Sequence, residues 1–389
     1  MIVGHYAPMI WAQGGIANYV SRLGAVQTAL GHTVYYFGNQ DATGVKSDSY
    51  IEVRNSEELF KHARVLGLDV LHLHKPVDVL PEDRVPVVRT FHGHQGSCPS
   101  GTRYLSRSGM PCNRAYSVFG CLWGHYVDRC GSRHPARVKE HFTRLHHEMR
   151  QASLVPTYTV SQYLYHQMVR SGCSSELLHT ILSPAPEVTH PYRPPEPGGV
   201  SHFVFLGRLV PQKGLSWLLR AIGKVSRPVH LDVAGDGYER DESQRLAERL
   251  GIADRVTFHG WVEQSVVSTL ILNARAVIFP SVWQEPAGLV SLEAAAHGRA
   301  VIASRVGGIP EYATEEYALL VEPNDVDGLA DCIDRLASDV QLAEHLGRNG
   351  MELMGKRFSM AGFMDQLEAF YNRAIMRVNN APLESRGVS

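Results

Sequence analysis

Residues 276–298, AVIFPSVWQEPAGLVSLEAAAHG, decide the fold of this chain. The short apolar run Ala276–Pro280 predicts a buried strand. Apolar residues then recur at helical spacing between Leu289 and Ala296, and a glycine closes the run. Pro286 fits the first turn of that predicted helix, because a proline there gives up no helical hydrogen bond. The sequence therefore predicts a strand, a loop and a helix that opens at the end of the strand.

Two carboxylates, Glu285 and Glu293, lie eight positions apart on this unit. Glu285 is expected on the loop before the helix, and Glu293 about two turns into it. A helix N-terminus at the end of a strand binds anions, because free N–H groups and the positive end of the helix dipole face the ligand. Glu293 is then near enough to bind hydroxyl groups of an anion-bearing ligand. The plainer reading, carboxylates that only complement the dipole, suits Glu285 in part but not Glu293.

This spacing resembles the E-x7-E element of the retaining glycosyltransferases of family 4, which have the GT-B fold and use nucleotide sugars. Further segments resemble motifs of the same family and occur in its order: GRLVPQKG (207–214), LDVAGDG (231–237), VTFHG (256–260) and SRVGGIPE (304–311). Each motif alone is weak evidence, whereas the ordered set over roughly residues 200–330 is specific.

The resemblance implies an α/β protein of GT-B type, with two doubly wound Rossmann-like domains that face a central cleft. The chain has 389 residues, which is long for one core, and strand-like segments alternate with helix-like segments in both halves. We expect an acceptor-binding domain over residues 1–185, with a Cys-rich basic insertion at about 93–150. A nucleotide-sugar-binding domain is expected over 200–358, and a helix over 359–378 that crosses back to the first domain. The Pro- and Gly-rich segment 183–200 predicts the connector.

Arg208 and Lys213 are the predicted cations of the donor site. By the resemblance, both contact the donor diphosphate and stabilise the departing nucleotide. Arginine suits this task because it stays charged and can bind a phosphate through two parallel hydrogen bonds. In isolation, a solvated surface pair would be the plainer reading of these two residues.

The resemblance also assigns the two glutamates. Glu293 holds the ribose hydroxyls and Glu285 faces the donor sugar. Ala287 stands where the family often has Phe, so the resemblance does not define the shape of the sugar pocket. Backbone amides at the start of the helix complete the predicted donor site: Gly288, Leu289 and Val290.

His92 and a glycine pair are the predicted contributions of the N-terminal half. His92 resembles the family's histidine that faces the reacting sugar, where it would orient the donor hydroxyl and the acceptor rather than act as a base. Gly14 and Gly15 resemble the family's glycine-rich loop, at which a backbone can approach phosphate or sugar closely. The plainer reading of His92 is a polar side chain whose hydrogen bonds are satisfied, and that of Gly14 and Gly15 is a tight turn. Three other histidines are expected to be ordinary polar residues: His72, His74 and His94.

Residues 101–150 are strongly basic, with nine Lys or Arg, three Asp or Glu and five His, in a chain whose net charge is −1. Two readings stay open: a solvated helical surface, or a basic rim for a phosphate-bearing acceptor or an anionic membrane leaflet. The overall charge argues against a nucleic-acid-binding protein.

No metal or other cofactor is expected. The cysteines Cys98, Cys112, Cys121 and Cys130 lack the Cys-x-x-Cys spacing of a zinc site, so loop packing is expected, with a metal or a disulfide left open. Asp325-x-Asp327 resembles a metal-binding pair but reads as the capped start of a late helix.

The resemblance thus implies retaining transfer of a hexosyl unit from a nucleoside-diphosphate sugar, UDP favoured and GDP open. The acceptor would be a sugar, a lipid-linked molecule or a small molecule. The alternatives are an epimerase or phosphorylase of the same fold, or a catalytically silent relative that binds a sugar or a partner. The chain has no apolar stretch of membrane-spanning length and no signal-like start, so we expect a cytoplasmic protein, at most peripheral at the inner membrane face.

Overall fold

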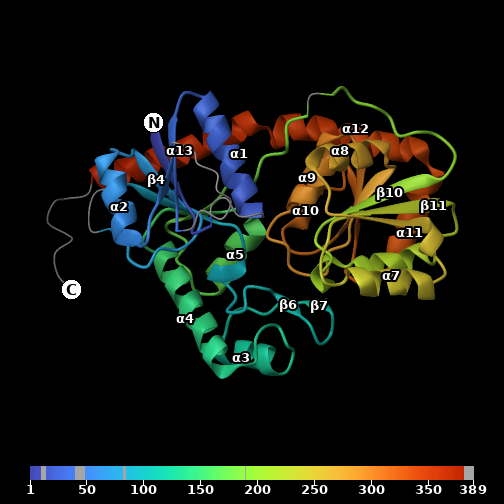
Figure 1. Ribbon diagram of the computed structural model, residues 1–389, viewed down its shortest axis with the longest axis horizontal. Helices are drawn as coiled ribbons and strands as arrows, with labels where there is room; N and C mark the ends of the chain where they lie inside the picture. Colours follow the sequence, from blue (N-terminus) through green and yellow to red (C-terminus); the bar gives the residue numbers. More distant parts are fainter. Residues whose placement is uncertain (10–14, 40–48, 82–84, 189, 381–389) are drawn as a thin grey trace.

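The computed structural model describes residues 1–9, 15–39, 49–81, 85–188 and 190–380. Two parallel sheets lie side by side within these residues, each covered by helices (Figure 1). In the described part of the first sheet, seven strands run in the order β3-β2-β1-β4-β5-β8-β9. These strands are β1 (Ile2–Tyr6), β2 (Thr33–Gly38), β3 (Tyr50–Glu52), β4 (Val70–Leu73), β5 (Val87–Phe91), β8 (Thr157–Thr159) and β9 (Leu178–Thr180). The helices of this half are α1 (Gly15–Ala29), α2 (Ser56–Val65), α3 (Val118–Tyr126), α4 (Pro135–Ala152) and α5 (Gln162–Arg170).

The second sheet has the order β12-β11-β10-β13-β14-β15, and all of its described pairings are parallel. Its strands are β10 (Ser201–Leu206), β11 (Val229–Ala234), β12 (Val256–Gly260), β13 (Ala276–Phe279), β14 (Ala300–Ser304) and β15 (Ala318–Val321). Its helices are α6 (Leu215–Ile222), α7 (Arg240–Arg249), α8 (Gln264–Asn273), α9 (Leu289–Ala296), α10 (Ile309–Tyr312), α11 (Val326–Ser338) and α12 (Val340–Arg357).

Alternating side chains explain why helices cover both faces of the second sheet. Phe203 and Phe205 of β10 pack in one core cluster with residues of α6 and α11. Val204 and Leu206 of the same strand pack in another cluster with residues of α9. Since both faces are buried, the strands read as continuous apolar runs. The predicted α/β fold with two doubly wound parallel sheets is confirmed.

The order of the second sheet reverses at β10, which pairs with β11 on one side and β13 on the other. Ligands of such sheets bind beyond the carboxyl ends of the strands at this switch point. The segment after β10 carries Arg208 and Lys213, and the segment after β13 carries Glu285. The topology therefore brings these residues to one edge of the sheet.

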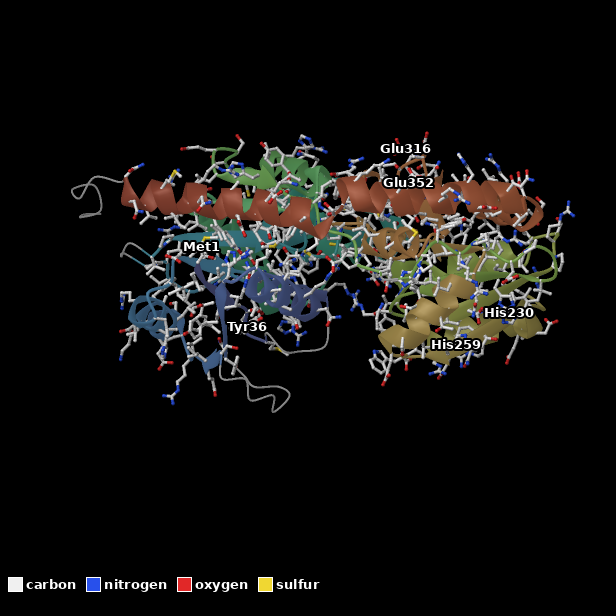
Figure 2. All side chains as sticks on the ribbon, turned by 90° about the horizontal axis from the view of Figure 1, so that it is seen from above. Met1, Tyr36, His230, His259, Glu316 and Glu352 are labelled. Carbon is white, nitrogen blue, oxygen red and sulfur yellow. The ribbon has the colours of Figure 1, made fainter. Side chains whose placement is uncertain are left out.

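The last helix, α13 (Met360–Asn379), returns from the second half to the first sheet. Its N-cap is Ser359, whose side chain accepts a hydrogen bond from the Gly362 amide. Apolar residues of α13, among them Leu367 and Phe370, share a core cluster with residues of β1, β4 and β5. Figure 2 shows α12 and α13 following one another along the length of the molecule. This helix ties the two halves together.

Helix α9 begins at Leu289, so the prediction that Pro286 lies in its first turn is wrong. The carbonyl oxygens of Glu285 and Pro286 have other partners: the Gly308 amide at 2.7 Å and the Ser161 hydroxyl at 2.6 Å. These bonds hold the segment in a loop. Glu293 consequently lies about one turn into the helix rather than two.

The insertion contains the hairpin β6 (Tyr104–Leu105) and β7 (Met110–Pro111) together with α3 and α4. Figure 1 shows α3 at the far end of α4, away from both sheets. Throughout the described ranges, no helix combines the length and the apolar character needed to cross a bilayer.

Candidate functional site

Arg208 lies just beyond the carboxyl end of β10 and is exposed. Within the described residues its guanidinium makes no ion pair or hydrogen bond. An arginine without a protein partner at the switch point of a parallel sheet keeps all of its donors for a ligand. The position suits a phosphate group.

Lys213 is paired, unlike Arg208. Its ammonium lies 2.6 Å from a carboxylate oxygen of Glu285, and the Ser281 hydroxyl donates to the same oxygen at 2.7 Å. The ammonium also lies 5.6 Å from the ring centres of both Phe279 and Trp283. The side chains of the pair are 18% and 6% exposed, so the contact is largely shielded from water. Glu285 therefore holds Lys213 in place and neutralises its charge.

Two glycines let the segments of this edge pack closely. A Cβ atom on Gly214 would lie 1.9 Å from the Pro280 carbonyl oxygen, and Gly214 has a φ of +72°. A Cβ atom on Gly307 would lie 2.3 Å from the Glu285 oxygen. The loops after β10 and β14 therefore pack directly against the backbone of the segment that carries Pro280 and Glu285. Only glycine permits this close approach.

The N-terminal half contacts the same segment. Ser161 donates to the Pro286 carbonyl oxygen, and the His94 ring donates through Nε2 to the carbonyl of Gln284. Glu311 of the C-terminal half accepts from the amides of Gln162 and Tyr163 at 2.7 and 2.6 Å. Those amides are the first of α5, so this carboxylate stabilises the N-terminus of a helix in the other half. The Glu285 loop is thus fixed between the two halves.

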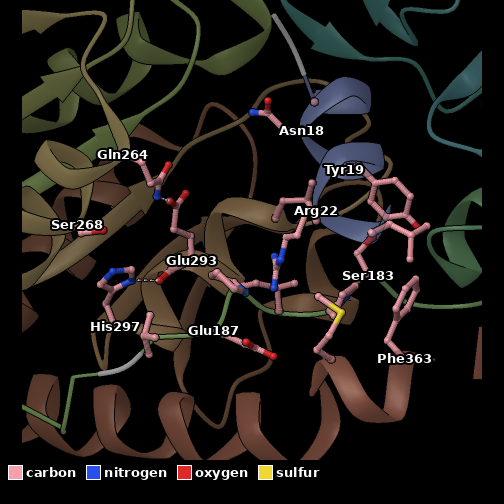
Figure 3. A pocket seen from close by; sticks show the side chains of 18 residues that line it. Asn18, Tyr19, Arg22, Ser183, Glu187, Gln264, Ser268, Glu293, His297 and Phe363 are labelled. Carbon is pink, nitrogen blue, oxygen red and sulfur yellow. Dashed lines mark hydrogen bonds between the residues drawn. The ribbon is translucent and has the colours of Figure 1, made fainter. Parts of the chain in front are cut away.

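A cavity of about 550 Å³ lies between the halves (Figure 3). Helix α1 lines one side of it, α8 and α9 the other, and the connector and the start of α13 close it. Glu293 faces this cavity and accepts a hydrogen bond from the Gln264 amide at 2.5 Å, while the His297 ring donates to the Glu293 carbonyl at 2.8 Å. Gly15 and Leu289 also line it, whereas Gly14 lies outside the described residues.

The predicted donor residues do not all share one cavity. Gly15, Leu289 and Glu293 share the cavity, but four residues do not line it: His92, Arg208, Lys213 and Glu285. At the start of α9, Gly288 is the N-cap and Val290 lies in the first turn. The first amides of a helix have no partner within the helix, so they remain available to a ligand.

His92 follows β5 and borders a separate cavity of about 80 Å³, together with Lys75, Arg89 and Glu148. Its Nε2 lies 3.0 Å from Nδ1 of His74. Burial, together with the charges of Lys75 and Arg89, lowers the pKa of His92 to about 3. A neutral ring cannot donate a proton as an acid, which agrees with an orienting role.

The four cysteines of the insertion line one small cavity of about 30 Å³ and are free thiols. Burial raises the pKa of Cys130 to about 12, so this thiol is protonated near neutral pH. Among the described residues, the set of ligand atoms spaced for a metal belongs instead to His5, His72 and His74. Asp325 accepts from the Gly328 amide at 2.9 Å and caps α11, as predicted.

Sequence reasoning missed two contacts. His94 was expected to be an ordinary polar residue, yet it joins the halves at Gln284. Glu311 was noted only as part of a turn motif, yet it caps α5. The N-cap pattern at Ser161 announces a helix, but no local pattern shows that a distant carboxylate reaches its amides.

Two wholly parallel, doubly wound sheets and a helix that crosses back define the class as a GT-B fold, and solved structures agree. Sucrose-phosphate synthase from Thermosynechococcus elongatus is similar over 97% of this chain and 99% of its own, with a TM-score of 0.71 and 21% identity. Anabaena Alr3699/HepE, solved in complex with UDP, is similar over 96% and 99%, with a TM-score of 0.64 and 17% identity. At such identities the likeness shows the fold alone.

Residues 191–353 match the family described as glycosyl transferases group 1. Lipopolysaccharide core biosynthesis glycosyltransferase LpsD of Rhizobium meliloti (strain 1021) is 36% identical over 175 residues, which are 45% of this chain and 50% of that protein. The chain spans about half the length of the curated relatives it matches, 40% of one and 50% of another.

Proposed function

We propose that this protein is a retaining glycosyltransferase that moves a hexosyl unit from a nucleoside-diphosphate sugar to an acceptor hydroxyl. The observation that carries the proposal is Arg208, which has no side-chain partner among the described residues and lies at the switch point of the second sheet. The segment after the neighbouring strand β13 leads into α9, whose Glu293 lines a cavity between the halves. A UDP-sugar is favoured, which the UDP complex of the structural neighbour HepE supports, and a GDP-sugar is the second choice.

The diphosphate would lie across Arg208 and the first amides of α9, with the ribose hydroxyls on Glu293. As the bond from the anomeric carbon to the phosphate oxygen breaks, negative charge grows on that oxygen, and these donors stabilise it. Lys213 can add its charge only if it leaves Glu285 for the phosphate. The acceptor oxygen attacks from the same face of the sugar, and its proton passes to the departing phosphate.

This arrangement needs no metal ion, because permanent cations and a helix dipole replace the divalent ion that assists other transferases. His92 would orient a hydroxyl of the donor or acceptor through hydrogen bonds. Closure of the halves around the donor would exclude water, which otherwise competes with the acceptor.

The acceptor would approach from the side of the insertion. Helix α3 exposes Phe119 to 87%, Trp123 to 59% and Tyr126 to 45% at a spacing that places them on one face. Aromatic residues beside a basic segment suit an anionic membrane surface. We therefore assign α3 to peripheral contact at the inner face of the membrane, where a lipid-linked acceptor would be found.

Vesicle sedimentation tests this contact. Vesicles with anionic lipid should bind the protein, neutral vesicles should not, and the double change Phe119→Ser and Trp123→Ser should abolish binding. Equal binding of the double variant would show that Phe119 and Trp123 do not make the membrane contact.

A thermal-shift screen of nucleotides and nucleotide sugars tests the proposed donor site. A nucleotide present at 100 times its dissociation constant stabilises the folded state by about 2.7 kcal/mol. UDP and UDP-sugars should raise the melting temperature, and Glu293→Gln should reduce the rise. A chain that no nucleoside diphosphate stabilises would not be a nucleotide-sugar enzyme.

Product analysis separates the alternatives. A transferase incubated with donor alone releases the nucleotide and free sugar slowly. An epimerase instead forms a second nucleotide sugar without releasing nucleotide, and a silent relative binds without turnover.

A further inference from the structure

Buried histidines form a hydrogen-bonded chain that ends at His92. His5 lies on β1 and His74 just after the neighbouring strand β4, and they are 0% and 3% exposed. Gln27 Oε1 lies 2.7 Å from Nε2 of His5, and Nδ1 of His5 lies 3.0 Å from Nε2 of His74. Nδ1 of His74 then lies 3.0 Å from Nε2 of His92. These four residues are called the histidine chain below.

The chemistry of the amide sets the direction of every bond in the histidine chain. An amide oxygen only accepts, so His5 must carry its hydrogen on Nε2. A neutral imidazole has one hydrogen, which leaves Nδ1 of His5 as an acceptor for a hydrogen on Nε2 of His74. His74 then has no hydrogen on Nδ1, so Nδ1 accepts a hydrogen bond from His92, and the hydrogen of His92 must be on Nε2. The lone pair of His92 is then on Nδ1, for which the described residues provide no partner.

Two further observations support this assignment. Gln27 Nε2 donates to the Tyr371 hydroxyl at 3.3 Å, which opposes rotation of the amide that would exchange its oxygen and nitrogen. Burial lowers the pKa of His5 to about 4 and that of His92 to about 3, and it holds the pKa of His74 well below its ordinary value. All three rings are therefore neutral near pH 7, as the direction of the bonds requires.

We infer that Gln27 is a positioning residue that acts through His5 and His74 to fix the tautomer of His92. His92 then presents an acceptor nitrogen to a sugar hydroxyl, so it selects and orients a group that donates a hydrogen bond. The inference about the sugar rests on the proposed function, whereas the tautomer does not. Tyr371 belongs to α13, so the crossing helix contributes to the site in the first sheet.

Nitrogen NMR of protein with ¹⁵N-labelled histidine tests the tautomer directly. His92→Gln identifies the His92 signals in the spectrum. The wild-type protein should show His92 protonated on Nε2 and unprotonated on Nδ1. The opposite pattern would overturn the inference, and this first test requires no folded Gln27 variant. One bound metal ion per chain, with the ring nitrogens as its ligands, would also overturn it.

Gln27→Leu removes the amide and should leave His92 as a mixture of both tautomers. Gln151→Leu is the matched control, because Gln151 is also buried and hydrogen-bonded but contacts Val77 and Arg89 rather than the histidine chain. It should leave the His92 spectrum unchanged. A His92 spectrum that Gln27→Leu does not alter would refute a positioning role for Gln27.

Transfer kinetics give the second readout. Gln27→Leu should lower kcat about twofold with little change in donor KM, because an unbiased ring holds the competent tautomer about half of the time. An unchanged kcat together with an altered tautomer would refute the role in transfer and leave the histidine chain intact. Absence of transfer in the wild-type protein would instead count against the proposed function.

Discussion

Replacing Arg208 with alanine should almost abolish turnover without weakening the fold. The side chain is exposed and has no partner among the described residues, so its loss removes no contact within the protein. Substitutions of this kind change the free energy of unfolding by no more than about 0.5 kcal/mol. Loss of one preorganised donor to a developing oxyanion costs about 2.7–4 kcal/mol of transition-state stabilisation, or about 10²–10³ in kcat.

The assay measures nucleotide release from a UDP-sugar, with and without acceptor, alongside the melting temperature. Arg227→Ala is the matched control, because Arg227 is also exposed but precedes β11, at the amino ends of the strands of the same sheet. It should keep wild-type kcat. If Arg208→Ala retains wild-type kcat with every donor that binds, the diphosphate does not bind at this segment.

Three further outcomes are expected. Glu293→Gln should raise the donor KM more than it lowers kcat, because the ribose contacts are equal in the ground and transition states. Steady-state kinetics that show a loss confined to kcat would contradict this. Activity should survive EDTA, and a complete loss restored by Mg²⁺ or Mn²⁺ would show a metal requirement. Lowering the pH from 7 to 5 should lower the free energy of unfolding, because the pKa values of His5 and His92 in the folded protein are about 4 and about 3. Between those values and their ordinary range only the unfolded chain binds the protons, which costs up to about 1.4 kcal/mol per pH unit and group. Denaturant titrations should show a shallower pH dependence for His92→Gln, and an equal dependence would contradict the lowered pKa.

The fold was predictable because its signals are local and repeated. Apolar runs such as Ala276–Pro280 alternate with helical patterns, and that alternation implies parallel sheets. Local patterns of the same kind predict the strand that precedes Arg208 and the cap that Ser359 forms on α13.

The site was only partly predictable, because its missing parts depend on tertiary contacts. Pro286 reads as a helix start, but Ser161 from the other half binds its carbonyl and delays the helix. The pairing of Lys213 with Glu285 joins residues 72 positions apart, and the histidine chain joins residues of different strands and a helix. Side-chain bonds between distant segments leave no periodic trace in a sequence.

We propose, above all, that this chain cleaves a nucleotide sugar with retention of configuration and without a metal ion. Proton NMR of the protein with a UDP-α-sugar and EDTA tests it, before the released sugar equilibrates between anomers. We expect release of UDP and an α-configured sugar or product as the first species formed. A β-configured first product, or cleavage that occurs only when a divalent ion is added, would contradict it.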